Sequence, residues 1–452
     1  MNTPTTSLNL RYVLLISLVA AFGGFLFGYD TAVINGAIGY LTKHFHLSAE
    51  LTGWAASSLL VGCMIGAMVG GPMGDRFGRR PSLVFCAALF AVSSVASALP
   101  HTLAAFAWAR FAGGVAIGAA SMLSPLYIAE IAPEKVRGTL VALYQLAIVV
   151  GILVVFFVNL QIQRQGNEAW NTATGWRWML ASLAAPSVLF GFFMAVVPES
   201  PRWLMKMGRP DEARAVLARV AGEENAEREV RQIAEALQQE EGRWRELLAP
   251  GCRRALLIGI GLAVFGQFSG INSIMYYATD IFKAAGAGTD AAFRQTVTVG
   301  VVNLLFTFVA IWLVDKAGRR PLLIAGTIVQ VVALAFVGAT FNRGGGNTGL
   351  LIGILGFVAA FAVAMGPIPW IVNSEIFPTK LRGRAMSVAI FCLWFADWLV
   401  TQTFPMLREG IGPAKTFWVY ATCSLLSTVF VIALVPETKG RTLEEIEKSW
   451  KR

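Results

Sequence analysis

Apolar residues run along the chain in twelve long blocks, separated by short polar segments and one long polar stretch. Each block spans about 20 residues or more, which lets an α-helix cross about 30 Å of hydrocarbon. The sequence therefore predicts an all-α membrane protein with twelve transmembrane helices. The predicted spans are 12–36, 51–73, 81–100, 103–129, 139–160, 178–197, 255–279, 295–314, 321–342, 349–374, 385–407 and 416–435.

Polar signals between the first six spans return between the last six. The segment Asp75-Arg-Phe-Gly-Arg-Arg reappears as Asp315-Lys-Ala-Gly-Arg-Arg, and the segment around Glu130 reappears around Glu375. A Pro-Glu-Ser triplet that ends the first set is matched by Pro-Glu-Thr at the end of the second. The offsets are 240, 245 and 238 residues. Such a duplication within a membrane protein is typical of transporters.

The repeat predicts three parts. Residues 1–197 form an N-terminal six-helix bundle, residues 198–254 form a charged cytoplasmic linker with helices over 210–221 and 225–241, and residues 255–452 form a C-terminal six-helix bundle with a cytoplasmic tail. A regulatory or partner-binding role for the linker remains an alternative to a simple connection.

Composition and charge placement agree with a membrane protein. Hydrophobic residues make up 56% of the chain and charged residues 14%, against about 25% charged in soluble domains. The net charge of +10 is concentrated on one side: with twelve spans, 28 Lys and Arg residues fall on the side of the termini and 8 on the other. This bias predicts cytoplasmic termini and explains the basic balance without nucleic acid.

The residues give no sign of enzyme chemistry. The five cysteines lie in or beside spans without zinc or redox spacing, and neither a nucleotide loop nor a nucleophile–base pair is recognisable. We therefore expect a non-enzyme with no metal and no cofactor, working as a monomer in the lipid bilayer.

Three charged residues fall inside the predicted spans: Asp30, Arg110 and Asp397. Each costs about 2.5–3.5 kcal/mol at mid-membrane on insertion scales, so each should face a partner or a cavity. Asp30 and Arg110 are expected to pair. Either they form a static bridge between two helices, or Asp30 takes a proton when Arg110 moves away.

Glycines in two spans indicate special helix behaviour. We expect three glycines before Asp30 to loosen the first span beside a cavity, and four glycines spaced every four residues to form a close-packing seam on the second span. These are Gly23, Gly24 and Gly28, and Gly62, Gly66, Gly70 and Gly74.

Amide and aromatic side chains recur inside the spans. Amides donate to and accept from hydroxyl groups, and aromatic rings pack on sugar C–H faces, so the set fits a polyhydroxylated neutral ligand. For any single amide, contact between helices is the alternative. The residues are Gln145, Gln267, Asn272, Tyr276, Tyr277, Asn303, Trp370 and Trp394, with Gly366 one turn before Trp370. The seventh span, which carries Gln267 to Tyr277, is predicted to be broken by Gly266 and Gly270.

Along its whole length the chain resembles the sugar porter family of the major facilitator superfamily. The motifs are Gly-Tyr-Asp ending at Asp30, Gly-Asp-Arg-Phe-Gly-Arg-Arg ending at Arg80, Pro-Glu-Ser-Pro-Arg-Trp-Leu from Pro198, Gly-Ile-Asn ending at Asn272 with Tyr-Tyr after it, Asp-Lys-Ala-Gly-Arg-Arg from Asp315, and Pro-Glu-Thr-Lys-Gly from Pro436.

The resemblance implies roles for particular residues. It implies proton coupling at Asp30 with Arg110, in a multi-pass protein of the bacterial inner membrane. A monosaccharide site is implied at Phe27, Gln145, Ile152, Gln267, Asn272, Asn303, Gly366, Trp370 and Trp394, beside which we include Tyr276 and Asp397. A cytoplasmic charge network that stabilises the outward-open state, called here the latch, is implied at Asp75, Arg76, Arg80, Glu130, Arg137, Asp315, Arg319, Glu375 and Arg382.

Departures from the family pattern bear on the substrate. Gly266 and Leu393 stand where many relatives carry amides, and Asp397 stands where asparagine is usual. Ile152 resembles glucose-type rather than xylose-selective members. Asp397 either bonds a hydroxyl or titrates as a second site.

We therefore expect proton-coupled symport of a glucose-like hexose. The alternatives are a facilitative uniporter and a proton-coupled transporter of a polyol such as myo-inositol. Drug or sugar efflux and sugar sensing without transport are further possibilities.

Overall fold

The computed structural model describes residues 9–133, 136–237, 244–344, 346–377 and 381–439, and these residues are helical apart from turns and connecting loops. Twelve of its helices, counting helices joined end to end as one, are long and apolar enough to cross a membrane. The prediction of twelve spans is confirmed, and the chain is a multi-pass membrane protein. Residues 440–452, most of the predicted tail, lie outside the described residues.

The first five spans are continuous helices, and the sixth consists of consecutive helical segments. The first runs to Phe45, nine residues beyond the predicted end. Proline occurs inside the second and fourth, as Pro72 and Pro125, without ending them. The elements are α1 (Leu10–Phe45), α2 (Ala49–Phe77), α3 (Arg79–Ala98), α4 (Leu103–Ile131), α5 (Arg137–Gln163) and a sixth span made of α6 (Glu168–Trp170), the π-turn η1 (Asn171–Gly175), α7 (Trp176–Ala181) and α8 (Ala184–Val196).

Two of the last six spans are interrupted. The seventh breaks at Gly270, whose φ of 84° is left-handed and suits glycine. The tenth breaks at residues 364–367, just before Ile368. The elements are α12 (Pro250–Phe268), α13 (Ile271–Ala284), α14 (Thr289–Ala317), α15 (Arg319–Asn342), α16 (Asn347–Val363), α17 (Ile368–Ile376), α18 (Arg382–Gly410) and α19 (Pro413–Leu434).

The linker between these sets is helical where it is described. Its elements are α9 (Pro201–Lys206), α10 (Pro210–Ala221), α11 (Glu223–Leu237) and the 3-10 turn η2 (Trp244–Leu248). Two of these agree with the helices expected over 210–221 and 225–241, although 238–241 lies outside the described residues.

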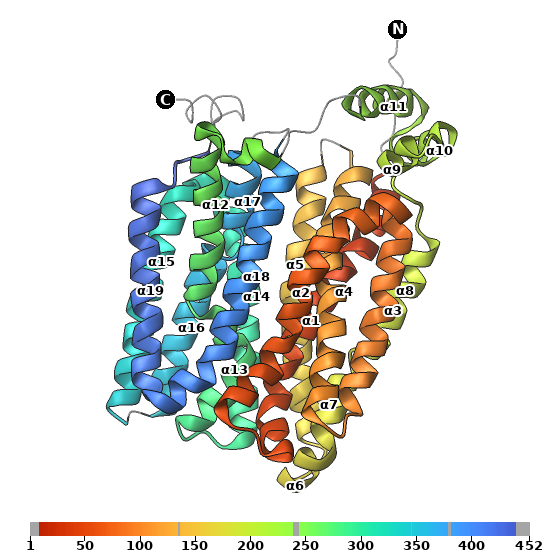
Figure 1. Cartoon of the computed structure of the whole chain (residues 1–452). Helices are drawn as coiled ribbons and strands as arrows, with labels where there is room; N and C mark the ends of the chain where they lie inside the picture. Colours follow the sequence, from red (N-terminus) through yellow and green to blue (C-terminus); the bar gives the residue numbers. More distant parts are fainter. Residues whose placement is uncertain (1–8, 134–135, 238–243, 345, 378–380, 440–452) are drawn as a thin grey trace.

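The helices form two bundles that stand side by side (Figure 1), one built from α1–α8 and the other from α12–α19. The bundles meet where α2 packs on α18, α5 on α14 and α1 on α13. The helices α9, α10 and α11 cover one end of the molecule, which we call the linker end, and α6 lies at the other, which we call the α6 end.

Glycine serves close packing rather than loosening in this fold. The expectation that Gly23, Gly24 and Gly28 loosen α1 is wrong, since the helix continues unbroken to Phe45. A Cβ at Gly28 would collide with the backbone oxygen of Ile148 on α5. The four-residue seam on α2 does pack against α4, where its glycines face the backbone or side chains of Phe111, Val115, Ala119 and Leu123.

Candidate functional site

Asp30 of α1 and Arg110 of α4 meet inside the N-terminal bundle. Their side chains are 1% and 2% exposed. Nη1 of Arg110 donates to Oδ1 of Asp30, and Nη2 donates to the backbone oxygen of Asp30 at 3.0 Å. Oδ2 of Asp30 and Nε of Arg110 are buried without a hydrogen-bond partner among the described residues. One oxygen of the carboxylate is therefore held by Arg110, while the other makes no hydrogen bond within the described residues.

The break between α12 and α13 positions two amides in the C-terminal bundle. Because the chain turns at Gly270, the side chains of Gln267 and Asn272 come together, and Nδ2 of Asn272 donates to Oε1 of Gln267 at 2.8 Å. Gly266 faces open space, since a Cβ there would meet no heavy atom within 4 Å. The unwound segment thus presents hydrogen-bonding groups beside an unfilled volume.

Asp397 of α18 lies one turn beyond Trp394 toward the α6 end and is 1% exposed. Oγ1 of Thr401 donates to its Oδ1 at 3.1 Å, and the hydroxyl of Tyr276 lies 3.4 Å from its Oδ2. The ion pairs found among the described residues do not include Asp397.

Aromatic rings from the two bundles contact each other close to Asp397. The rings of Phe27 on α1 and Trp394 on α18 have centroids 5.5 Å apart and are tilted by 50°. The indole Nε1 of Trp394 is buried with no hydrogen-bond partner among the described residues. Such an N–H group is available to a ligand oxygen.

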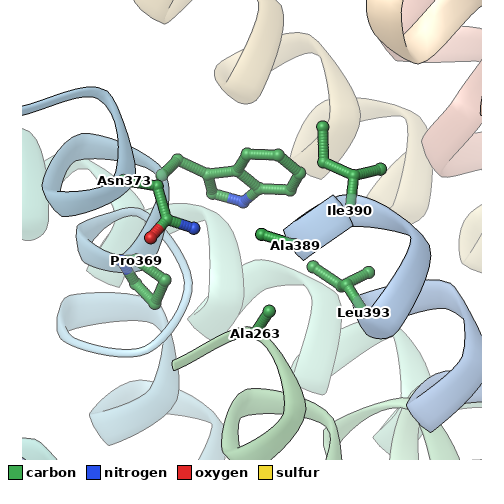
Figure 2. A pocket seen from close by; sticks show the side chains of 7 residues that line it. Ala263, Pro369, Asn373, Ala389, Ile390 and Leu393 are labelled. Atoms are coloured by element: carbon green, nitrogen blue, oxygen red, sulfur yellow. The ribbon is translucent and has the colours of Figure 1, made fainter. Parts of the chain in front are cut away.

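A small cleft opens where α12, α17 and α18 approach one another. Figure 2 shows Pro369 and Asn373 of α17 across from Ile390 and Leu393 of α18, with Ala263 of α12 nearby. Trp370 also lines this cleft and is 39% exposed. Gly366 lies in the turn that precedes α17, where it separates the two halves of the tenth span.

The remaining candidates lie on two helices that face each other across the bundles. Gln145 and Ile152 on α5 are half-buried, and Asn303 on α14 is 7% exposed. These residues thus lie on the two helices, α5 and α14, that pack against each other between the bundles.

Charged residues of the predicted latch gather at the linker end, within each bundle. Arg79 donates to Glu130 through Nε at 2.9 Å and to Asp75 through Nη1 at 2.9 Å. Arg319 makes the matching contacts with Glu375 at 3.0 Å and Asp315 at 3.1 Å. Sequence reasoning chose Arg76 and Arg80 and missed Arg79, although the repeat aligns Arg79 with Arg319.

The other latch candidates are not brought together. Arg76 is exposed beside the Phe77 ring, and Arg80 donates to the backbone oxygen of Ala195. Arg137 donates to the backbone oxygen of Ala132, and Nε and Nη2 of Arg382 are buried without partners among the described residues. In the part of the chain that the structure describes, the ion pairs of the latch stay within each bundle.

Two glutamates at the linker end went unnoticed as site residues, although the Pro-Glu triplets pointed to them. Glu199 accepts backbone N–H bonds from Arg79 and Arg80, and Glu437 accepts them from Arg319 and Arg320. Burial raises the pKa of Glu199 despite these bonds. Burial also acts on Glu437, but its backbone N–H bonds outweigh burial and lower its pKa.

Polar contacts between the bundles lie toward the α6 end. Asn35 on α1 donates to the backbone oxygen of Met275 at 2.7 Å and accepts from Thr279 on α13 at 2.5 Å. Ser57 on α2 donates to Gln402 on α18 at 2.8 Å.

An ion pair adds to these contacts: Nε of Arg164, just after α5, lies 2.7 Å from Oδ1 of Asp290 on α14. The bundles are thus joined at the α6 end, while no ion pair of the latch joins them at the linker end among the residues that the structure describes.

Comparisons with known proteins agree with this architecture. The family model described as "Sugar (and other) transporter" matches residues 16–450. The chain is 45% identical to the arabinose-proton symporter of Bacillus subtilis, covering 99% of this chain and 97% of that protein, and 40% identical to the D-xylose-proton symporter of Escherichia coli, covering 98% and 97%.

Solved structures of the Escherichia coli xylose transporter XylE also match. The inward-open form is 39% identical with a TM-score of 0.87, covering 97% of this chain and 100% of that one. The form bound to 6-bromo-6-deoxy-D-glucose, called a major facilitator superfamily proton:xylose symporter, is 40% identical with a TM-score of 0.81, covering 98% and 100%.

Proposed function

The chain belongs to the Sugar (and other) transporter family, and from this premise we propose that it carries a monosaccharide together with a proton across the membrane by alternating access. A member of this family is a transporter and not an enzyme. The observation that carries the proposal is the buried pair of Asp30 and Arg110. Charged side chains are costly to bury at this depth, and where they occur in membrane helices they typically belong to proton relays or substrate pathways.

The proton step follows from the geometry of that pair. While Arg110 donates to Asp30, the carboxylate is stabilised as an anion. When Asp30 takes a proton on its unpartnered oxygen, it loses most of its attraction for the guanidinium, and α1 and α4 are free to shift relative to each other. Loss of the proton restores the pair. We infer that the present contacts belong to the deprotonated, inward-facing state, with the α6 end closed.

The sugar site is proposed between the bundles. Gln267, Asn272 and Gln145 supply donors and acceptors for hydroxyl groups, and the Trp394 indole N–H supplies one more donor. Rings of Phe27, Trp370 and Trp394 offer faces for the C–H side of the sugar. Ile152, Asn303 and Gly366 complete the lining.

For the sugar itself, we propose a glucose-like hexose. The open space at Gly266 leaves room for a substituent beyond the ring, such as the C6 hydroxymethyl group that a pentopyranose lacks. A second candidate is arabinose, favoured by the 45% identity to an arabinose-proton symporter. Direct competition for binding by glucose, arabinose, xylose and myo-inositol separates these candidates. Tightest binding of a pentose would overturn the hexose proposal.

Transport in proteoliposomes tests the proton role. Asp30→Asn removes the titrating group and keeps the side-chain volume. We expect accumulation driven by a pH gradient to disappear while sugar counterflow, which needs no net proton movement, continues. Accumulation at the wild-type level in this variant would reject the proton-coupling role of Asp30. Wild-type uptake that does not depend on the pH gradient would indicate a uniporter.

A further inference from the structure

Asp397 differs from Asp30 in one physical respect. Both carboxyl groups are 1% exposed and both lie deep in a membrane helix, but only Asp30 has a cationic partner. A carboxylate without a cationic partner is strongly disfavoured in such a place relative to its neutral form. Burial without a cation therefore favours the protonated form of Asp397.

The immediate surroundings supply hydrogen bonds but no charge. The hydroxyl groups of Thr401 and Tyr276 lie 3.1 and 3.4 Å from the two carboxyl oxygens, and the Asn272 side chain stands beside them. A protonated carboxyl group can donate its hydrogen to the Tyr276 oxygen while it accepts from Thr401. We propose that Asp397 is a second proton-binding site, distinct from Asp30 and located in the other bundle.

Titratable groups face this site from the neighbouring helices. Tyr276 faces it from α13, which also carries Tyr277, Asp280 and Lys283 toward the α6 end. Cys63 of α2 is near enough to feel the charges of Asp397, Asp30 and Arg110. The Asp30–Arg110 pair is thus within electrostatic reach of Cys63, and Arg110 also of Tyr276. This pair is close to neutral as a unit, so it offers little compensation for a charge on Asp397.

The other helices that pack on α18 carry their charged groups near their ends. These are Arg253 and Arg254 on α12, Glu375 on α17 and Lys415 on α19, which also brings Tyr420 and Cys423. Tyr420 bonds Ser273 rather than Asp397.

The position of Asp397 decides which solution supplies the proton. Along α18 it lies between Trp394 and Gln402, and Gln402 bonds Ser57 in the layer that joins the bundles at the α6 end. Closure of that layer seals Asp397, and its opening exposes Asp397 to the α6 side. Asp397 therefore takes a proton from the α6 side before closure and returns it to the same side on opening. Protonation of Asp397 therefore controls the opening and closing of the contact layer at the α6 end, which we call the gate. It does not add to the number of protons carried per sugar.

Infrared spectroscopy of the purified protein in lipid tests proton occupancy without relying on transport. At neutral pH, the spectrum of wild type minus Asp397→Asn should contain the carbonyl stretch of a protonated carboxylic acid. Asp30→Asn is the matched control, since it removes an equally buried but paired carboxylate, and it should remove only carboxylate bands. Carboxylate bands alone in the Asp397→Asn difference would overturn the proposal.

A second variant keeps this test usable if Asp397→Asn does not fold. Thr401→Val retains the carboxyl group and removes one of its hydrogen-bond donors, so the acid band should shift in frequency. An acid band that stays in place in Thr401→Val would also count against the proposal.

Sugar counterflow tests the gate and rests on the proposed transport function. In the Asp30→Asn background, which still exchanges sugar and cannot titrate at Asp30, raising the pH on the α6 side should slow exchange, by up to about tenfold per pH unit for one linked proton. Adding Asp397→Asn to this background should remove the pH dependence. Equal pH dependence in both proteins would refute the gate. Absence of any transport by the wild type would instead refute the proposed function, while the infrared result would still stand.

Discussion

At the scale of single residues, charged side chains buried among apolar helices are held by specific contacts. Asp30, Arg110 and Asp397 stand out because charge inside an apolar block is costly, and the structure brings the first two together. The sequence could not tell which arginine of Gly78-Arg79-Arg80 turns inward. That choice follows from the left-handed Gly78, with φ of 99°, which starts α3 so that Arg79 faces Glu130.

The two capping glutamates should respond oppositely to pH. The pKa of Glu437 is lowered, so its contribution to stability is present above the ordinary glutamate pKa of about 4.3 and is lost as the pH falls. The pKa of Glu199 is raised, so its contribution is present at low pH and is lost as the pH rises through the folded-state value.

Thermal unfolding of purified Glu437→Gln and Glu199→Gln checks this difference. At neutral pH we expect Glu437→Gln to lower the melting temperature more than Glu199→Gln, with the gap narrowing near pH 4 (about the ordinary pKa of glutamate). An equal loss for both variants at every pH would contradict the assignment.

The exposed indole of Trp370 should contribute strongly to sugar binding. Removing an aromatic face from a sugar site costs on the order of 1 kcal/mol or more, so Trp370→Ala should weaken binding about tenfold. Trp312→Ala is the control, because Trp312 is also exposed but stacks with Lys316 near the linker end of α14. Titration calorimetry with the best sugar from the screen measures both, and equal affinities would place the site elsewhere.

At the scale of helices, the apolar blocks predicted the number of spans, and the glycines of the seventh span predicted its break at Gly270, but the break of the tenth span was not predicted. The end of α1 extends to Phe45 because a helix can continue through the polar residues Lys43 and His44 at the membrane edge. The break before Ile368 lies inside an apolar block, where glycine alone gives an ambiguous signal. The same ambiguity applies to Gly28, which the sequence predicts to loosen α1 but which lies in an unbroken helix.

Close helix packing at Gly28 can be measured. A methyl group at this position collides with the Ile148 backbone oxygen, which cannot move without shifting α5. We expect Gly28→Ala to lower the melting temperature by an amount that corresponds to about 1–3 kcal/mol. Gly138→Ala is the control, because a Cβ there meets nothing within 4 Å, and it should unfold like the wild type. A wild-type melting temperature for Gly28→Ala would show that α5 can shift to accommodate the methyl group.

At the scale of the whole molecule, the internal repeat predicted two matched bundles but not which end of their interface is closed. That depends on contacts between residues far apart in sequence, such as Asn35 with Thr279 and Ser57 with Gln402. The same sequence can form or break these contacts in different conformations, and a local sequence pattern does not indicate which conformation is favoured. The closed α6 end also agrees with the higher TM-score to the inward-open xylose transporter than to its sugar-bound form.

The central claim is that the pair of Asp30 and Arg110 couples sugar movement to a proton, and proton uptake on sugar addition tests it most directly. A pH electrode in a lightly buffered suspension of proteoliposomes records the external solution as sugar enters. The wild type should make that solution more alkaline, and Asp30→Asn should leave it unchanged although sugar still exchanges. An equal alkaline shift in both proteins would contradict the account.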